Sequence, residues 1–314
     1  MKRLLILATL LLALSTQGLR AEEKSMPTGK TTHLYAVKGA DSLYLDHYPA
    51  LAEGARPCVM FVFGGGFARG ERDKERDMPY FAFLQRNGYN VVSIDYRLGM
   101  RNAKSIGILD FFKLFERTIN MAVEDLFSAT TYIVNHAEEL SIDPAKIVAT
   151  GSSAGAITVL QGEYTICNKL PLASQLPEGF NYAGIISYAG AVFSLDGAPK
   201  WKSTSAPTML FHGNADNQVP YNKVAILGHG MYGSKYIAEQ FQENGIPYWF
   251  YSVEYENHSM AGKPMLDNHA EILIFLDEYV TKGRSLQRNT HIIDPEIPQR
   301  KTFFLPTDYI GSNY

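Results

Sequence analysis

The chain has 314 residues, of which 46% are hydrophobic and 19% are charged. This length and apolar share are enough for one large domain with a buried core, which excludes an intrinsically disordered chain. The formal net charge is −3. A mildly acidic protein has no electrostatic reason to bind nucleic acid, so we expect none as a partner.

The first 21 residues have the pattern of a secretory signal peptide. Lys2 and Arg3 give a positive start, and a mainly apolar run follows from Leu4 to Ser15. This run is shorter than the roughly 20 apolar residues that a membrane-spanning helix needs. We therefore predict cleavage after Ala21 and a mature protein, residues 22–314, that is periplasmic or secreted and has no stable membrane span. An uncleaved membrane anchor is the alternative.

Strand and helix patterns alternate along the rest of the chain. This alternation predicts an α/β fold with a mostly parallel sheet and crossover helices. The expected strands are 32–37, 42–48, 58–63, 90–96, 146–150, 183–188, 208–211 and, as the last one, 248–254. The expected helices are 77–87, 119–140, 154–167, most of 223–244, and a final helix with Ile272, Leu276, Tyr279 and Val280 on its core face.

Two segments and two cysteines allow alternatives. Residues 98–116 are rich in large apolar side chains, and form either a lid or pocket wall or the buried start of a helix. Residues 283–314 are a polar tail that either packs across the body or is loose. Cys58 and Cys167 are expected to be two separate buried thiols, with a disulfide as the alternative. No Cys/His cluster has metal-ligand spacing, so we expect no metal.

The segment Gly151-Ser152-Ser153-Ala154-Gly155 matches G-x-S-x-G between a predicted strand and a predicted helix. A serine on such a sharp turn has an exposed hydroxyl, and flanking glycines leave room for the turn. The helix N-terminus beneath it favours developing negative charge. Ser153 is therefore a candidate nucleophile, with a plain glycine-rich turn as the alternative.

The segment Phe63-Gly64-Gly65-Gly66-Phe67 follows an earlier apolar strand. Glycines allow backbone N–H groups to approach a substrate closely, as oxyanion stabilisation requires. Phosphate binding is the rival interpretation, but the segment lacks the Lys-Ser/Thr of a P-loop, and Arg69 and Gly70 do not fit the G-x-G-x-x-G register.

With Asp95-Tyr96-Arg97 added, these motifs resemble those of α/β-hydrolases in the small serine esterase and lipase branch, the carboxylesterase-like enzymes. That branch has an H-G-G-G-F/W loop, a D-Y-R and a G-x-S-A-G, in this order. The resemblance covers about residues 55–280 and implies the α/β-hydrolase fold, with helices on both faces of the sheet. Phe63 departs from the pattern, because the family usually has His there, and this puts the geometry of the loop in doubt.

The resemblance also implies an acid and a base after the nucleophile. Asp216 matches the acid of the family's H-G-x-x-D-x-x-V-P, and a surface turn Asp is the alternative. His258 follows the expected last strand and is the candidate base, although Asn257 stands where the family often has Gly. His269 is the rival, read more easily as a solvated residue at a helix start, and His212 is expected to be structural. We treat the glycosylation sequon at Asn257 as chance.

The resulting hypothesis is a serine esterase without cofactor. Ser153, His258 and Asp216 would form a catalytic triad, and backbone N–H groups of Ala154 and of Gly65 or Gly66 would form the oxyanion hole. The substrate would be a small-molecule or carbohydrate-linked ester, with acetyl or feruloyl groups as candidates. The alternatives are an exopeptidase-like serine hydrolase and a non-catalytic binding protein on a hydrolase scaffold.

Overall fold

One large sheet organises the molecule, and the computed structural model describes residues 26–101, 103, 108–201, 205–305 and 309 of it. The order across this nine-stranded sheet is β1-β2-β4-β3-β5-β6-β8-β11-β12. β1 and β2 pair antiparallel, β2 pairs antiparallel with β4, and all further neighbours are parallel. The strands are β1 (Thr31–Lys38), β2 (Asp41–Tyr48), β3 (Arg56–Val62), β4 (Asn90–Ile94), β5 (Ile142–Ser152), β6 (Gly184–Tyr188), β8 (Thr208–Gly213), β11 (Tyr248–Val253) and β12 (Gln287–Ile292).

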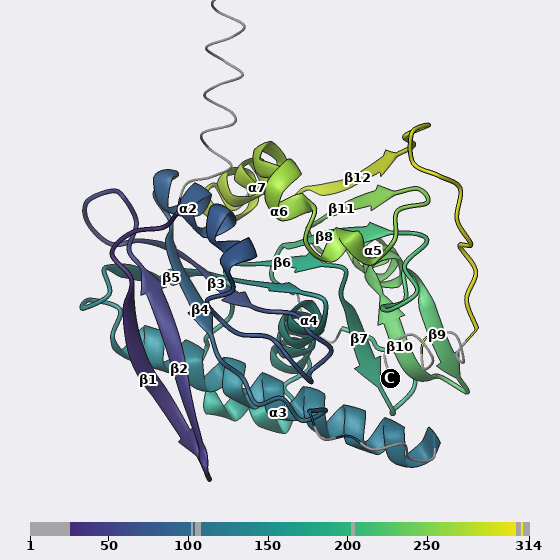
Figure 1. Ribbon diagram of the computed structural model, residues 1–314, viewed down its shortest axis with the longest axis horizontal. Helices are drawn as coiled ribbons and strands as arrows, with labels where there is room; N and C mark the ends of the chain where they lie inside the picture. The colour runs from purple at the N-terminus through teal and green to yellow at the C-terminus, as the bar shows by residue number, and fades with distance from the viewer. Residues whose placement is uncertain (1–25, 102, 104–107, 202–204, 306–308, 310–314) are drawn as a thin grey trace, which may run out of the picture.

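Helices cover both faces of this sheet, as expected (Figure 1). One face carries α3 (Ile108–Asn135) and α4 (Ala154–Cys167). The other carries α2 (Met78–Arg86), α6 (Pro264–Asp267), and α7 (His269–Phe275) with its π-helical continuation η4 (Leu276–Thr281). α5 (Ser234–Glu243) packs against β8 and β11. The 3-10 turns are η1 (Glu75–Asp77), η2 (Pro171–Gln175) and η3 (His258–Ala261).

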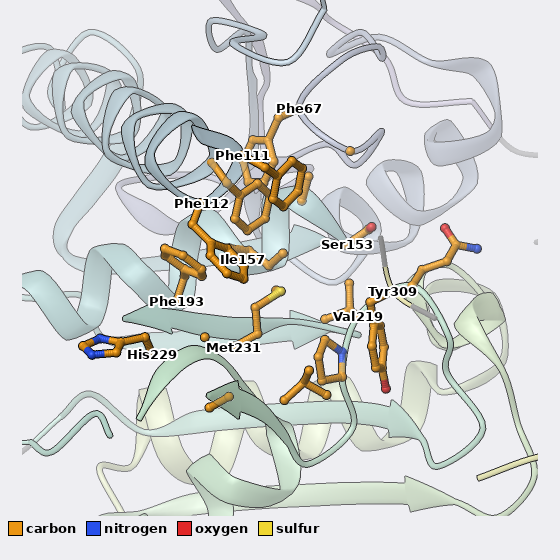
Figure 2. A pocket seen from close by; sticks show the side chains of 18 of the residues that line it. Phe67, Phe111, Phe112, Ser153, Ile157, Phe193, Val219, His229, Met231 and Tyr309 are labelled. Carbon is orange, nitrogen blue, oxygen red and sulfur yellow. The ribbon is translucent and has the colours of Figure 1, made fainter. Parts of the chain in front are cut away.

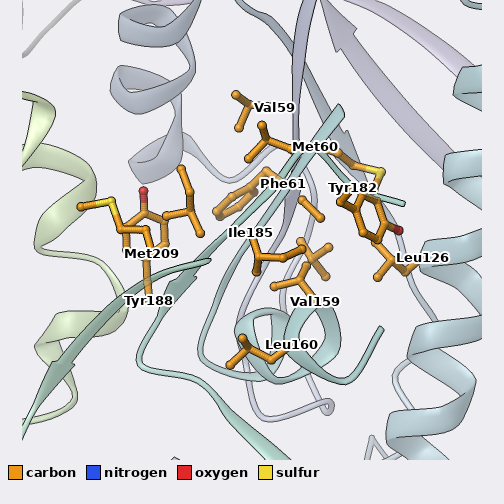
Figure 3. Packing of buried hydrophobic residues seen from close by; sticks show 14 of the residues in the cluster. Val59, Met60, Phe61, Leu126, Val159, Leu160, Tyr182, Ile185, Tyr188 and Met209 are labelled. Atoms are coloured by element: carbon orange, nitrogen blue, oxygen red, sulfur yellow. The ribbon is translucent and has the colours of Figure 1, made fainter. Parts of the chain in front are cut away.

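Strand β3 shows how the sheet is held between these layers. Its residues are buried on both sides because successive side chains point to opposite faces. Met60 reaches α3, where its sulfur lies 3.9 Å from the hydroxyl of Thr130. Phe61 points away from Met60 (Figure 3). It packs edge-on against Phe81 of α2, with ring centroids 5.2 Å apart. The strand therefore has a continuous apolar run in its sequence, as expected of an interior strand of the sheet.

A second, three-stranded sheet corrects the prediction of a mostly helical segment over 223–244. β7 (Ala191–Ser194), which the sequence analysis missed, pairs with β10 (His229–Gly233), and β10 pairs with β9 (Lys223–Ile226). Leu227 and Gly228 both have positive φ, 50° and 84°, and form the two-residue turn between β9 and β10. That backbone is incompatible with a helix, so α5 starts only at Ser234.

The tail contains the edge strand of the large sheet, so the prediction that 248–254 is the last strand was wrong. β12 lies parallel to β11, with Tyr248 opposite Gln287 and Val253 opposite Ile292. Its residues alternate between exposed and half-buried positions, as befits an edge. Its polar sequence, which resembles a loop, concealed it.

Other predictions were confirmed or lie outside the described residues. Cys58 and Cys167 are separate buried thiols, as predicted. The predicted signal peptide and part of the 98–116 segment lie outside the described residues. Within the described part of the chain, no helix combines the length and apolar character required to cross a membrane.

Candidate active site

Ser153 lies on a sharp turn between β5 and α4. Its backbone has φ 52° and ψ −116°, a conformation that costs energy in any residue other than glycine. The turn is closed tightly: a Cβ on Gly155 would lie 2.0 Å from the carbonyl oxygen of Val62, and one on Gly151 would lie 2.3 Å from the backbone of Gly155. A side chain at either flanking glycine of the motif would therefore clash with the backbone. The strained serine matches the nucleophile elbow that the motif predicts.

Three side chains from three strand ends form one hydrogen-bonded chain. The Nε2 atom of His258 lies 2.8 Å from the Oγ atom of Ser153. Its Nδ1 atom lies 2.7 Å from Oδ2 of Asp216. Asp216 follows β8 and His258 follows β11, so parallel strands bring their carboxyl ends to the same edge of the sheet. Because a carboxylate only accepts, Nδ1 carries the proton and Nε2 is free to accept one from Ser153.

Asp216 is fully buried and held by four donors. Its Oδ1 atom accepts from the N–H groups of Gln218 and Val219, at 2.8 and 2.9 Å. Its Oδ2 atom contacts His258 and also Nε2 of His212, at 3.2 Å. Burial raises the pKa of Asp216, but hydrogen bonds from the two histidines outweigh it and hold this pKa far below its usual range. The carboxylate is therefore ionised wherever the protein is folded near neutral pH.

His212 has a structural setting, as the sequence analysis expected. It is buried, with Nδ1 2.8 Å from the hydroxyl of Ser234 and Nε2 facing the carbonyl oxygen of Val219. Because Nε2 faces only acceptors, it is the protonated nitrogen, and Ser234 donates to Nδ1. The sequence analysis missed the additional contact of His212 with Asp216, although their spacing in H-G-x-x-D already brings them together at a strand end.

The loop that carries His258 is anchored on both sides. The carboxamide oxygen of Asn257 accepts from the N–H of Ser259 at 2.9 Å and caps η3. The buried hydroxyl of Ser152, next to the candidate nucleophile, donates to the carbonyl oxygen of Ala261 at 2.6 Å. Asn257 thus has a capping role in place of the glycine common in the family.

The glycine loop after β3 passes directly over this turn. A Cβ on Gly64 would lie 2.8 Å from the carbonyl oxygen of Ser152. Within the described residues, the N–H groups of Gly65 and Gly66 donate to no backbone carbonyl. Gly66 and Ala154 line the same pocket as Ser153. These are the positions expected of oxyanion donors.

Phe63, where the family usually has His, is supported by the D-Y-R motif. The hydroxyl of Tyr96 donates to the carbonyl oxygen of Phe63 at 2.9 Å, and the two rings lie 4.5 Å apart. The neighbouring Arg97 makes hydrogen bonds of 3.0 Å to both oxygens of Asp125 on α3. Tyr96 therefore supports the loop at Phe63 through a hydrogen bond and a tilted ring contact.

An apolar pocket opens on one side of Ser153 (Figure 2). The start of α3 and the small sheet β7-β10-β9 both contribute residues to this pocket. Of segment 98–116, Phe111, Phe112 and Phe115 belong to the start of α3 and also form part of the pocket wall. The principal apolar side chains are Phe67, Phe111, Phe112, Phe115, Phe193 and Met231. Tyr309 of the tail also lines the pocket and donates to the carbonyl oxygen of Asp216 at 3.3 Å. The sequence analysis did not identify Phe193, Met231 or Tyr309 as site residues, since their segments were not assigned to strands or placed in space.

A polar cleft opens on the other side of Ser153. It is lined by the glycine loop, by His258 and Ser259, and by the segment that leads to η1. The charged residues that line it are Arg69, Glu71, Lys74, Arg76 and Asp77.

The rival histidine is outside this site. His269 begins α7 and stacks on Phe83, with ring centroids 3.7 Å apart. Its Nε2 atom donates to the carbonyl oxygen of Met265 at 2.9 Å. It is half-buried and packed, not solvated as expected, and it lines neither pocket.

Comparisons with known sequences match part of the chain. The family model BD-FAE matches residues 45–171. Fumonisin B1 esterase of Sphingopyxis macrogoltabida is 29% identical over 125 residues, which are 37% of this chain and 22% of that protein. Lipase 2 of Moraxella sp. (strain TA144) is 29% identical over 97 residues, 31% of this chain and 19% of that protein. The chain therefore spans about a fifth of the length of these two curated relatives.

Solved structures match much more of the chain. The apo form of Thermogutta terrifontis esterase 2 has a TM-score of 0.58 at 24% identity, and the match covers 83% of this chain and 97% of that one. The same esterase with bound propionate has a TM-score of 0.57 at 24% identity, over 78% and 94%. At this identity the likeness concerns the fold. The chain therefore has the fold of these α/β-hydrolase esterases, and its partial sequence matches are to an esterase and a lipase.

Proposed function

We propose that this protein is a serine hydrolase that cleaves carboxylic esters through an acyl-enzyme. The observation that carries the proposal is the hydrogen-bonded chain from Ser153 through His258 to Asp216, built on a strained turn beside an apolar pocket. Ser153 is the nucleophile, His258 the general base and then the general acid, and Asp216 the residue that orients and stabilises the imidazolium.

The reaction has two steps. The Oγ atom of Ser153 attacks the ester carbonyl carbon while Nε2 of His258 takes its proton. The oxyanion is held by the N–H groups of Ala154 and of Gly65 or Gly66. When the tetrahedral intermediate collapses, the carbon–oxygen bond to the alcohol breaks and His258 passes the proton to the leaving oxygen. Water activated by His258 then releases the acid and restores Ser153.

The finer proposals concern substrate and location. Acylated carbohydrates, with acetyl or feruloyl groups, fit a site with an apolar pocket on one side and a polar cleft on the other. Export follows from the pattern of residues 1–21, and the mature protein then acts in the periplasm or outside the cell.

A fluorophosphonate probe tests the proposal directly. The purified protein is incubated with the probe, the label is located by peptide mass spectrometry, and p-nitrophenyl esters of increasing acyl length are assayed in parallel. We expect label on Ser153 and turnover of short acyl esters. Ser153→Ala is expected to lose both while remaining folded, and Ser187→Ala, a buried serine of β6, is the control that keeps both. Full turnover by Ser153→Ala would refute the assignment.

A further inference from the structure

Ser153 lies at the border between two pockets of opposite chemistry. Of the described residues, Gly66, Ser153 and Gln218 line both. The apolar pocket has aromatic and aliphatic walls, and the polar cleft has five charged side chains. An ester bound at Ser153 must place its acyl part in one and its alcohol part in the other.

The position of His258 decides which part goes where. His258 lines the polar cleft and is not among the residues of the apolar pocket. On the proposed mechanism, on which this inference rests, Nε2 of His258 must reach the leaving oxygen to protonate it. The alcohol therefore lies in the polar cleft, and the acyl chain lies in the apolar pocket.

The charged side chains of the cleft then indicate which chemical group the alcohol carries. Arg76 pairs with the buried Asp77, its Nε atom 3.2 Å from Oδ1. Burial raises the pKa of Asp77, and the nearby charges of Arg76 and Lys74 counteract this rise. Within the described residues, neither Lys74 nor Arg69 forms an ion pair. Glu71 is exposed and is the remaining carboxylate of the lining.

Arg69 is joined to the glycine loop through its backbone. Its N–H donates to the carbonyl oxygen of Gly65 at 3.2 Å, which closes the glycine loop into a turn. Lys74 directly precedes η1 and is half-buried. Both are cations that line the cleft with His258, at the side where the alcohol leaves.

We propose that the physiological ester has a leaving alcohol with an anionic group, a carboxylate or a phosphate, which Arg69 and Lys74 bind. These two residues thereby determine the alcohol specificity, while the aromatic pocket accepts the acyl group. The cations act on binding of the alcohol and take no part in proton transfer.

The test uses three butyrate esters with the same reacting bond. They are esters of 4-(hydroxymethyl)benzoate, of 4-(hydroxymethyl)phenyl phosphate, and of the neutral methyl 4-(hydroxymethyl)benzoate, and the released alcohol is measured by chromatography. We expect kcat/KM for an anionic ester to exceed that for the neutral one by roughly three- to tenfold at low ionic strength, because exposed charge pairs contribute modestly. Salt at about 0.5 M is expected to reduce this ratio toward one. The preferred anion distinguishes carboxylate from phosphate.

Two double variants, each of which removes two positive charges, distinguish a local effect of the cleft from an effect of net charge. Arg69→Gln with Lys74→Gln is expected to bring the ratio of anionic to neutral kcat/KM to about one. Lys113→Gln with Arg117→Gln, two exposed cations of α3 that line neither pocket, is expected to keep the wild-type ratio.

A wild-type preference for the neutral ester, or a preference for anions that survives Arg69→Gln with Lys74→Gln, would overturn the inference. Labelling of Ser153 by fluorophosphonate in every variant shows that the site is intact. Absence of label and of turnover for all three esters would instead overturn the proposed function itself.

Discussion

The hydroxyl of Ser152 donates to the carbonyl oxygen of Ala261, 109 residues further along the chain. This bond of 2.6 Å joins the end of β5, which carries Ser153, to η3, which begins with His258. The second residue of G-x-S-x-G, which the motif leaves open, thus links the turn that carries Ser153 to the segment that carries His258.

Replacing Ser152 by Ala should therefore act on the chemical step. We expect kcat on p-nitrophenyl butyrate to fall about tenfold with little change in KM, because misplacement by a fraction of an ångström affects the reacting geometry. The free energy of unfolding should fall by about 1 kcal/mol for the lost hydrogen bond. Steady-state kinetics and urea unfolding measure the two effects.

Ser187→Ala is the matched control for this prediction. Ser187 is a buried hydroxyl on the neighbouring strand β6, and within the described residues its Oγ atom has no hydrogen-bond partner. Its removal should leave kcat unchanged. Equal kcat values for Ser152→Ala and the wild type would contradict a positioning role of Ser152.

Two glycines of the loop allow the effect of a steric clash to be distinguished from the effect of backbone strain. A Cβ on Gly65 would lie 2.0 Å from the carbonyl oxygen of Arg69, a backbone atom that cannot move aside cheaply, whereas a Cβ on Gly66 would meet nothing within 4 Å. Both residues have positive φ. We expect Gly65→Ala to lower kcat by about 100-fold, the scale of one lost oxyanion donor, and Gly66→Ala to lower it less. Similar losses in both variants, measured on one ester, would contradict this account.

Met231 should limit the length of the acyl chain. Its side chain projects from β10 into the apolar pocket, between Phe193 and Val219 (Figure 2). Shortening it to Ala should move the optimum of kcat/KM across p-nitrophenyl esters toward chains about two carbons longer. Met209→Ala, a change at a buried methionine of β8 outside the pocket, should lower stability by about 2–5 kcal/mol without moving this optimum. An unchanged optimum in Met231→Ala would place the acyl chain elsewhere.

Stability should depend on pH through His47. Burial lowers its pKa, and a hydrogen bond of 3.0 Å to Oδ1 of Asn90 opposes this only in part. The unfolded chain, with a His pKa of about 6.5, therefore binds a proton before the folded one does. The contribution of neutral His47 to the free energy of unfolding is therefore complete above this pH. It is lost as the pH falls below it, with a slope of up to about 1.4 kcal/mol per pH unit.

Thermal or urea unfolding between pH 5 and 8 checks this prediction. His47→Gln retains a donor toward Asn90 but does not titrate, so its stability should change less between pH 6.5 and 5 than that of the wild type. Equal pH profiles for the two proteins would show that other groups govern the acid side.

Much of the fold could be predicted because its signals are local. The helix 154–167 was predicted with the bounds of α4, since a glycine-rich turn and an apolar run mark it. The order of Ser153, Asp216 and His258 was implied by the resemblance to the esterase and lipase branch, and the structure brings the three side chains within hydrogen-bond distance.

The errors have a common physical cause. β9 and β10 carry apolar residues at spacings that also suit a helix, and only the positive φ of Leu227 and Gly228 reveals a hairpin. β12 is polar because it lies at an edge, so its strand character depends on pairing with β11 and not on its own sequence. The pocket wall formed by the small sheet could not be predicted, because Phe193 and Met231 come together only when β7 pairs with β10.

The small sheet β7-β10-β9 is hydrogen-bonded separately from the nine-stranded sheet. Ser153, Asp216 and His258 follow strands of the larger sheet, whereas much of the acyl side of the site is built on the smaller one. On the proposed mechanism, we therefore expect that exchanging residues 223–233 for those of a homologous chain changes the acyl preference and leaves Ser153, Asp216 and His258 in place.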